Sequence, residues 1–169
     1  MKSETRQQCE DAVKKFANKI NDVYSVAKKP KLLYVGLAGD PVGGEYSPLF
    51  HGFEVTTFDI DQQWNPDIVG DITKTVFEDE SWDVIVCVQT LEHIPNIWDL
   101  APELQRILKK GGMAIVDCPW QYPYHGEYNF GDYWRISKDG MKVLFKSFDI
   151  VSILDYNSNT SCLIRKPLS

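Results

Sequence analysis

The sequence lacks several features that would place it in well-defined classes of protein. Its 169 residues contain no Cys-x-x-Cys pair, no run of Lys or Arg longer than two, and no apolar stretch near the roughly 20 residues that a membrane-spanning helix needs. The first residues are polar and do not form the apolar region of a signal peptide. These absences argue against a secreted disulfide-bonded protein, a clustered basic nucleic-acid surface and a membrane protein.

Charge and composition set further limits. Eighteen basic against 24 acidic side chains give a net charge of −6, which disfavours nucleic acid or an anionic membrane as a partner. The four cysteines lie far apart, at Cys9, Cys87, Cys118 and Cys162, and no metal-ligand set is predicted. We therefore expect a soluble, cytoplasmic chain, and its length suits a single hydrophobic core.

Apolar residues at helical spacing predict three helices. The first stripe runs from Cys9 to Tyr24 and ends before Lys29-Pro30. The second covers 97–108, and the following Lys109-Lys110-Gly111-Gly112 is typical of a glycine C-cap. The third is expected to begin at Ser137, a good N-cap.

Short apolar runs alternate with these helices. They lie at 31–36, 53–61, 66–72, 82–89, 113–119, 148–156 and 161–166. Strands that alternate with helices predict an α/β fold with a doubly wound, mostly parallel seven-stranded sheet and helices on both faces. The last two runs are expected to form a C-terminal antiparallel hairpin.

In such a sheet, ligands bind at the carboxyl ends of the strands. The first predicted strand is followed by a glycine-rich loop, 36–44, where a backbone could approach a ligand closely, or which is simply a turn. The second ends at Asp59, 23 residues past Gly36, close to the spacing of an acid that binds ribose hydroxyls. Alternatively, Asp59 is a strand-end acid that faces water. Asp71 follows Ile68-Val69-Gly70 and could receive an adenine amine.

The order of these segments resembles the class I, Rossmann-like S-adenosylmethionine-dependent methyltransferases over residues 31 to about 166. The resemblance rests on Gly36-Leu37-Ala38-Gly39, Asp59, Asp71-Ile72, Val88-Gln89-Thr90-Leu91-Glu92-His93 and Leu108-Lys109-Lys110-Gly111-Gly112. It implies a cofactor domain at 30–169, with the helix of 1–29 as a lid, a sheet flank or a homodimer contact. The cofactor-binding residues that it implies are Gly36, Leu37, Ala38, Gly39, Asp59, Ile60, Asp71, Ile72, Gln89 and Thr90.

The first motif departs from the family pattern. Tyr34 stands where an acid is usual, and Ala38 and Asp40 stand where glycine is frequent. Two hypotheses follow: an active methyltransferase, or an inactive cofactor-binding or scaffold protein. A nicotinamide-dependent oxidoreductase would need Gly-x-Gly-x-x-Gly, which Ala38 and Pro41 interrupt.

The segment 117–137 holds seven aromatic rings within fifteen residues. Its opening, Asp117-Cys118-Pro119-Trp120, is similar to a motif of adenine-modifying methyltransferases, but it follows the fifth strand rather than the fourth. We expect Trp120, Tyr124 and Tyr128 to form pocket walls and Arg135 to bind substrate, whereas Tyr133 and Trp134 suit the core. Alternatively, Arg135 pairs with Asp132 or Glu127 and shapes the loop.

Methyl transfer to a hydroxyl requires a base beside the cofactor. The candidate catalytic residues are His125, His93 and Asp132; a loop histidine exposed to solvent and a turn-capping histidine are the structural alternatives. Asp132-Tyr133-Trp134-Arg135 resembles a subgroup associated with saccharides and other polar small molecules. The sequence therefore predicts methyl transfer to such a small molecule, on oxygen, with nitrogen as the alternative acceptor atom.

Overall fold

A computed structural model of the chain describes residues 4–26, 29–37, 46–126 and 130–169. The strands are β1 Lys31–Val35, β2 Glu54–Asp59, β3 Ile68–Val69, β4 Trp82–Cys87, β5 Leu108–Pro119, β6 Asp149–Asp155 and β7 Asn159–Arg165. The helices are α1 Glu4–Tyr24, α2 Leu100–Ile107 and α3 Lys138–Leu144, with short 3-10 turns η1 Ser47–Leu49, η2 Gln62–Trp64, η3 Leu91–His93 and η4 Ile97–Asp99.

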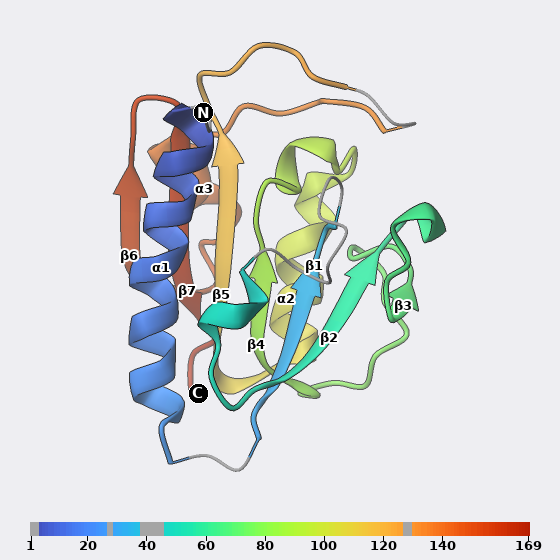
Figure 1. Ribbon diagram of the computed structural model, residues 1–169, viewed down its shortest axis with the longest axis vertical. Coiled ribbons are helices and arrows are strands. Elements are labelled where there is room, and N and C mark those ends of the chain that lie inside the picture. The colour runs from blue at the N-terminus through green and yellow to red at the C-terminus, as the bar shows by residue number, and fades with distance from the viewer. Residues whose placement is uncertain (1–3, 27–28, 38–45, 127–129) are drawn as a thin grey trace.

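The strands form one seven-stranded sheet in the order β3-β2-β1-β4-β5-β7-β6 (Figure 1). Strands β1 to β5 pair in parallel, and β7 pairs antiparallel with both β5 and β6. The chain leaves β1 in one direction toward β3 and then returns to add β4 and β5 on the other side. The predicted doubly wound sheet with its C-terminal hairpin is confirmed, and its switch point lies between β1 and β4.

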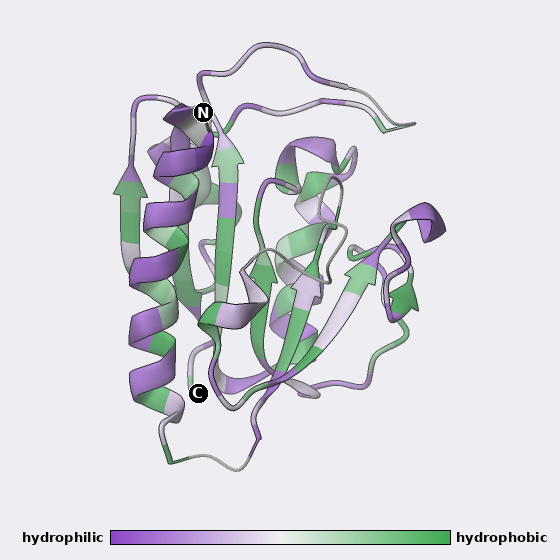
Figure 2. Ribbon diagram, in the orientation of Figure 1, coloured by the Kyte–Doolittle hydropathy of each residue, from purple (hydrophilic) through white to green (hydrophobic). Residues whose placement is uncertain are grey.

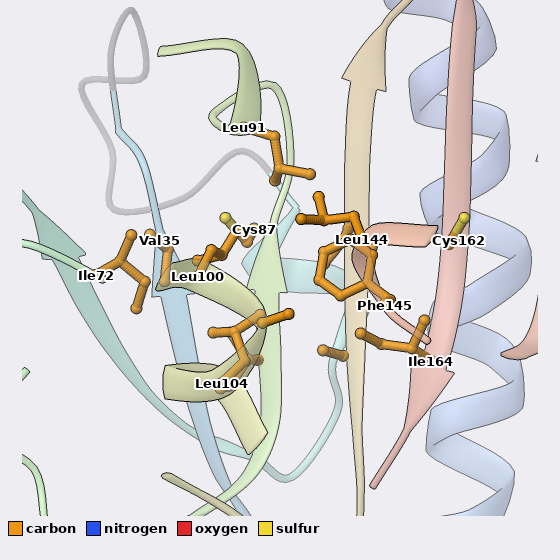
Figure 3. Packing of buried hydrophobic residues seen from close by; sticks show 14 of the residues in the cluster. Val35, Ile72, Cys87, Leu91, Leu100, Leu104, Leu144, Phe145, Cys162 and Ile164 are labelled. Carbon is orange, nitrogen blue, oxygen red and sulfur yellow. The ribbon is translucent and has the colours of Figure 1, made fainter. Parts of the chain in front are cut away.

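The central strands are buried on both faces because helices cover both sides. In β1, Leu33 and Val35 belong to the cluster beneath α2 and α3, whereas Leu32 and Tyr34 belong to the cluster beneath α1. This alternation follows from the period of two in a strand. The central strands are correspondingly hydrophobic in Figure 2. Leu100 and Leu104 of α2 lie near Cys87 of β4 in Figure 3.

Helix α1 packs its apolar stripe on the sheet of the same chain. The buried stripe consists of Cys9, Ala12, Val13, Phe16, Ala17 and Ile20. It shares a core cluster with Ile115 of β5 and Leu163 of β7. The stripe ends before Val23, which is 60% exposed. Among the described residues, no helix is long and apolar enough to cross a membrane.

The segment 108–112 differs from its prediction. Helix α2 ends at Ile107, and Leu108 already pairs with Trp82 of β4. Gly111 has a φ of +74° and donates its amide to the Lys166 carbonyl, so this glycine allows the register shift between β4 and the start of β5. The predicted glycine C-cap is therefore wrong, because strand pairing takes over directly after the helix. At the start of α3, the Ser137 hydroxyl accepts the Gly140 amide at 3.3 Å, which confirms the predicted N-cap.

Candidate active site

A cavity of about 1000 Å³ opens at the carboxyl ends of β1, β2 and β4. Its position is the switch point of the sheet, where ligands bind in this architecture. One side is lined by residues at or shortly after the ends of β1, β2, β3 and β4: Gly36, Asp59, Ile60, Asp71, Ile72, Gln89 and Thr90. The other side is lined by His93 and by the segment that follows β5, and Arg6 and Cys9 of α1 complete the wall.

Gly36 and Asp59 lie side by side at the carboxyl ends of β1 and β2. Gly36 has a φ of +86°, and a Cβ there would overlap the Thr90 hydroxyl. Only glycine therefore fits without a shift of this loop. The Asp59 carboxylate accepts the amide of Leu37 at 2.6 Å and that of Asp61 at 2.8 Å. Asp59 is 7% exposed and lines the cavity, while Leu37 is buried in the core behind it.

The remaining predicted cofactor residues on this side lie along β2 and β3. Ile60 is 67% exposed at the cavity rim, and Ile72 is buried in its wall. Asp71 also lines the cavity, and its carboxylate accepts the amide and hydroxyl of Thr73 at 2.9 and 2.7 Å. The predicted contacts of Ala38 and Gly39 fall outside the described residues.

Gln89 follows β4 with a φ of +51°, an unusual conformation for a residue with a side chain. Its amide donates to Asp117, which is fully buried and also accepts the hydroxyl of Ser161. Burial raises the pKa of Asp117 to about 7, against the opposing effect of these hydrogen bonds. This buried network fixes the loop that carries Gln89 and Thr90 over the cavity.

His93 and His125 meet at the other end of the cavity. His93 belongs to η3, after β4, and His125 to the segment after β5; their rings lie 5.0 Å apart. Nδ1 of His93 lies 2.6 Å from the carbonyl of Gly131, and Phe130 packs on the His93 ring at 4.5 Å. Both candidate catalytic histidines thus line the same cavity as the predicted cofactor residues.

Glu92 joins this pair, although no site role was predicted for it from the sequence. It is completely buried, and its Oε1 lies 3.7 Å from Nε2 of His93 and 3.6 Å from Nε2 of His125. Its backbone carbonyl accepts the amide of Tyr133 at 2.7 Å, which ties the segment after β5 to η3. The Glu92 carboxylate has the largest effect on the pKa of His125, which it raises. The Pro123 carbonyl and Asp132 raise this pKa further, whereas partial burial lowers it.

Asp132 lies behind His125 and does not line the cavity. Its Oδ2 accepts the His125 amide at 2.8 Å and lies 3.2 Å from His125 Nδ1. Arg135 pairs with Asp132 at 2.5 Å and also donates to the carbonyls of Tyr122 and Pro123, both at 2.9 Å. The Arg135 guanidinium holds the pKa of Asp132 well below its usual range, which makes Asp132 a poor proton acceptor. The structure gives Arg135 the loop-shaping position that the sequence left open.

The aromatic residues divide differently from the prediction. Trp120 and Tyr124 do not line the cavity; the Trp120 indole donates to the Tyr156 carbonyl, and Tyr124 is 74% exposed. Tyr128 lies outside the described residues. Tyr122, Phe130 and Tyr133 line the cavity instead. As expected, Trp134 packs against the core, and its indole donates to the Ile94 carbonyl at 2.7 Å.

Comparisons with known proteins agree with this geometry. Residues 42–116 match a family described as a methyltransferase domain. A sterol 4-C-methyltransferase of Caenorhabditis elegans is 41% identical over 49 residues, which cover 29% of this chain and 15% of that protein. An uncharacterized methyltransferase of Mycobacterium avium is 33% identical over 51 residues, which cover 30% of this chain and 20% of the relative. The chain thus spans only a small part of these curated relatives.

Solved structures share the whole fold. A Pyrococcus horikoshii protein superposes with a TM-score of 0.64 at 19% identity and 88% coverage of both chains. The 1,6-didemethyltoxoflavin-N1-methyltransferase of Burkholderia thailandensis, solved with S-adenosylhomocysteine, superposes with a TM-score of 0.67 at 12% identity, covering 92% of this chain and 78% of that one. The chain therefore has the Rossmann-like fold of these solved proteins, and its residues 42–116 match a methyltransferase domain.

Proposed function

We propose that the chain is an S-adenosylmethionine-dependent methyltransferase that methylates a polar small molecule, a saccharide or a similar compound, on oxygen. The observation that carries the proposal is that one cavity contains both the predicted cofactor-binding residues and the candidate catalytic bases. Gly36, Asp59 and Asp71 lie at one side, and the histidine pair lies at the other. An inactive cofactor-binding protein would have no need for the bases.

The cavity fits the cofactor in size and in chemistry. Its volume, about 1000 Å³, stands at the upper end of the range for small-molecule sites, which leaves room for a second molecule beside a nucleoside-sized one. Asp59 keeps acceptor capacity beyond its two backbone amides, because a carboxylate can accept about four hydrogen bonds. This capacity suits ribose hydroxyls, and Asp71 and Ile72 suit the adenine ring. When bound, S-adenosylmethionine supplies an electrophilic methyl group to the acceptor oxygen and leaves as S-adenosylhomocysteine.

The residues of the chain must orient the acceptor and remove its proton. His125 and His93 are the proposed bases, because both reach the cavity and Asp132 anchors the His125 backbone beside it. Tyr122, Phe130 and Tyr133 offer flat faces for a sugar ring and for exclusion of water. The buried Glu92 carboxylate stabilises the positive charge that a histidine acquires when it takes the proton.

Methyl transfer from labelled S-adenosylmethionine onto sugars, sugar nucleotides and small hydroxy acids tests this proposal. We expect turnover on at least one hydroxylated acceptor, with the label in a methyl ether by NMR. His125→Ala and His93→Ala are expected to lower the rate by about a hundredfold or more for the residue that is the base. His51→Ala is the matched control, because this third histidine is exposed in a turn outside the cavity.

Two results would contradict the proposal. Binding of S-adenosylmethionine with no transfer to any acceptor, including those of a cell extract, would favour the inactive cofactor-binding protein. A methyl group found on nitrogen or carbon would refute the oxygen specificity but leave the transferase activity standing.

A further inference from the structure

The buried carboxylate of Glu92 has an unusual environment. The side chain is completely buried, yet neither Oε1 nor Oε2 has a hydrogen-bond partner in the described part of the chain. A buried charge without partners is unfavourable, and such groups are normally hydrogen-bonded, paired or bound to a metal. Among the described residues, Glu92 therefore lacks the hydrogen-bond partner that its buried position calls for.

The nearest polar atoms are two imidazole nitrogens. Nε2 of His93 and Nε2 of His125 lie 3.7 and 3.6 Å from Glu92 Oε1, beyond a good hydrogen bond. The three donor atoms all lie within 4.8 Å of one another. Two ligands bound to one tetrahedral ion at 2.0–2.1 Å are separated by about 3.4 Å. The two separations from Glu92, 3.6 and 3.7 Å, are close to this value, and all three atoms lie within 4.8 Å, so side-chain movements would bring them to one ion.

The far side of each imidazole is already oriented as in a metal site. Nδ1 of His93 lies 2.6 Å from the carbonyl of Gly131, so this nitrogen carries the proton and Nε2 offers its lone pair. Nδ1 of His125 lies 3.2 Å from both Asp132 Oδ2 and the Pro123 carbonyl, and these two acceptors are nearer than the Arg135 donor at 3.5 Å. A carboxylate behind a ligating histidine is the usual outer support of a metal ligand.

We propose that Glu92, His93 and His125 bind one divalent transition-metal ion of the Zn²⁺ type. Two imidazoles and one carboxylate suit such ions better than Mg²⁺ or Ca²⁺, which prefer oxygen ligands. Three protein ligands leave a further position open, and both histidines border the cavity, so this position is accessible to a ligand there. The spacing of the residues along the chain hides the set, because 31 residues separate His93 from His125.

A bound ion would take over from the histidines the activation of the acceptor in the proposed function, on which this second step rests. An acceptor hydroxyl at the open position would lose its proton more readily, and the proton would pass to solvent rather than to a histidine, because both Nε2 lone pairs would hold the metal. The acceptor oxygen would then be fixed at the histidine end of the cavity, away from Asp59 and Asp71.

The test is metal binding by the full-length, untagged protein after removal of metals with a chelator. Calorimetric titration with Zn²⁺ is expected to give one equivalent bound, and Co²⁺ is expected to give the visible absorption of a site with imidazole and carboxylate ligands. Glu92→Gln, His93→Ala and His125→Ala should each weaken Zn²⁺ binding by more than about tenfold, and Asp132→Asn by about ten- to a hundredfold. His51→Ala and Glu78→Gln, at exposed positions, should leave it unchanged.

Absence of stoichiometric Zn²⁺ and Co²⁺ binding by the wild-type protein would overturn the proposal, and so would equal losses in His51→Ala and His93→Ala. The wild-type titration decides even if a ligand variant fails to fold, and circular dichroism of the metal-free variants identifies such a failure. Binding of S-adenosylhomocysteine is measured separately. Cofactor binding without metal would refute only the metal site, whereas metal binding without cofactor would refute the proposed function.

Discussion

Replacement of Gly36 by alanine tests how tightly the loop after β1 is fitted to the loop after β4. Two costs add at this position. The φ of +86° is unfavourable for an L-residue by about 1–2 kcal/mol. The new Cβ would also overlap the Thr90 hydroxyl, which donates to the Val88 carbonyl at 3.1 Å. Displacement of that hydroxyl would cost about another 1 kcal/mol.

Gly52 provides the matched control. It has a similar φ of +81°, but a Cβ there would meet no atom within 4 Å. Gly52→Ala should therefore lower the free energy of unfolding by about 1–2 kcal/mol, and Gly36→Ala by about 2–3 kcal/mol. Urea denaturation at equilibrium measures both. Addition of Thr90→Ala to Gly36→Ala removes the overlapping oxygen and should cost less than the sum of the two single changes. Equal losses at Gly36 and Gly52, or strict additivity with Thr90→Ala, would refute the close fit.

Three further predictions concern the surrounding scaffold. Ser137→Ala should lower the free energy of unfolding by about 1 kcal/mol through loss of the α3 N-cap, whereas Ser25→Ala, at an exposed site, should cost less; equal effects in urea denaturation would contradict the cap. Because the folded pKa of Asp117 is raised to about 7, its contribution to stability is complete below its ordinary pKa and is lost as the pH rises through about 7. The fall in unfolding free energy from about pH 5 to about pH 8 should thus be smaller in Asp117→Asn by about 2–3 kcal/mol, and parallel pH profiles for both proteins would argue against a raised pKa. Arg135→Ala should destabilise the fold by about 2 kcal/mol because the buried Asp132 carboxylate loses its guanidinium partner and keeps only its contacts with His125. Arg165→Ala, whose pair with Asp149 is about half exposed, should cost under about 1 kcal/mol, and a cost for Arg135→Ala as small as this one would place Asp132 in water.

The fold was accessible from the sequence because its signals are local and repeated. The apolar run of β4, the helical stripe of α1 and the Ser137 N-cap each depend on residues near one another in the chain, and all appear as expected. The helix C-cap predicted at Gly111-Gly112 was wrong because the same local pattern, glycine after basic residues, can end a helix or lie in an irregular part of a strand. The pairing of Leu108 with Trp82, which decides between them, is a long-range contact.

The candidate site could be predicted only in part for the same reason. Asp59, Asp71 and Gln89 follow strands directly, so the topology alone brings them to one edge of the sheet. The segment 121–136 has no regular periodicity. Long-range contacts, which a local sequence pattern does not show, decide which of its aromatic rings line the cavity. Tyr133 and Trp134 both donate their amides to the Glu92 carbonyl, yet Tyr133 lines the cavity while Trp134 packs against the core. A site role for Glu92 becomes visible only from its proximity to His125, which lies 33 residues further along the chain.

The central claim is that the cavity binds an S-adenosylmethionine-type cofactor with Asp59 at its ribose. Calorimetric titration with S-adenosylhomocysteine tests it most directly, with Asp59→Asn as the variant and Asp22→Asn, an exposed acid on α1, as the matched control. We predict one site per chain, an affinity weakened by about tenfold or more in Asp59→Asn, and no change in Asp22→Asn. Absence of binding to the wild-type protein, or equal affinity in Asp59→Asn, would contradict the account.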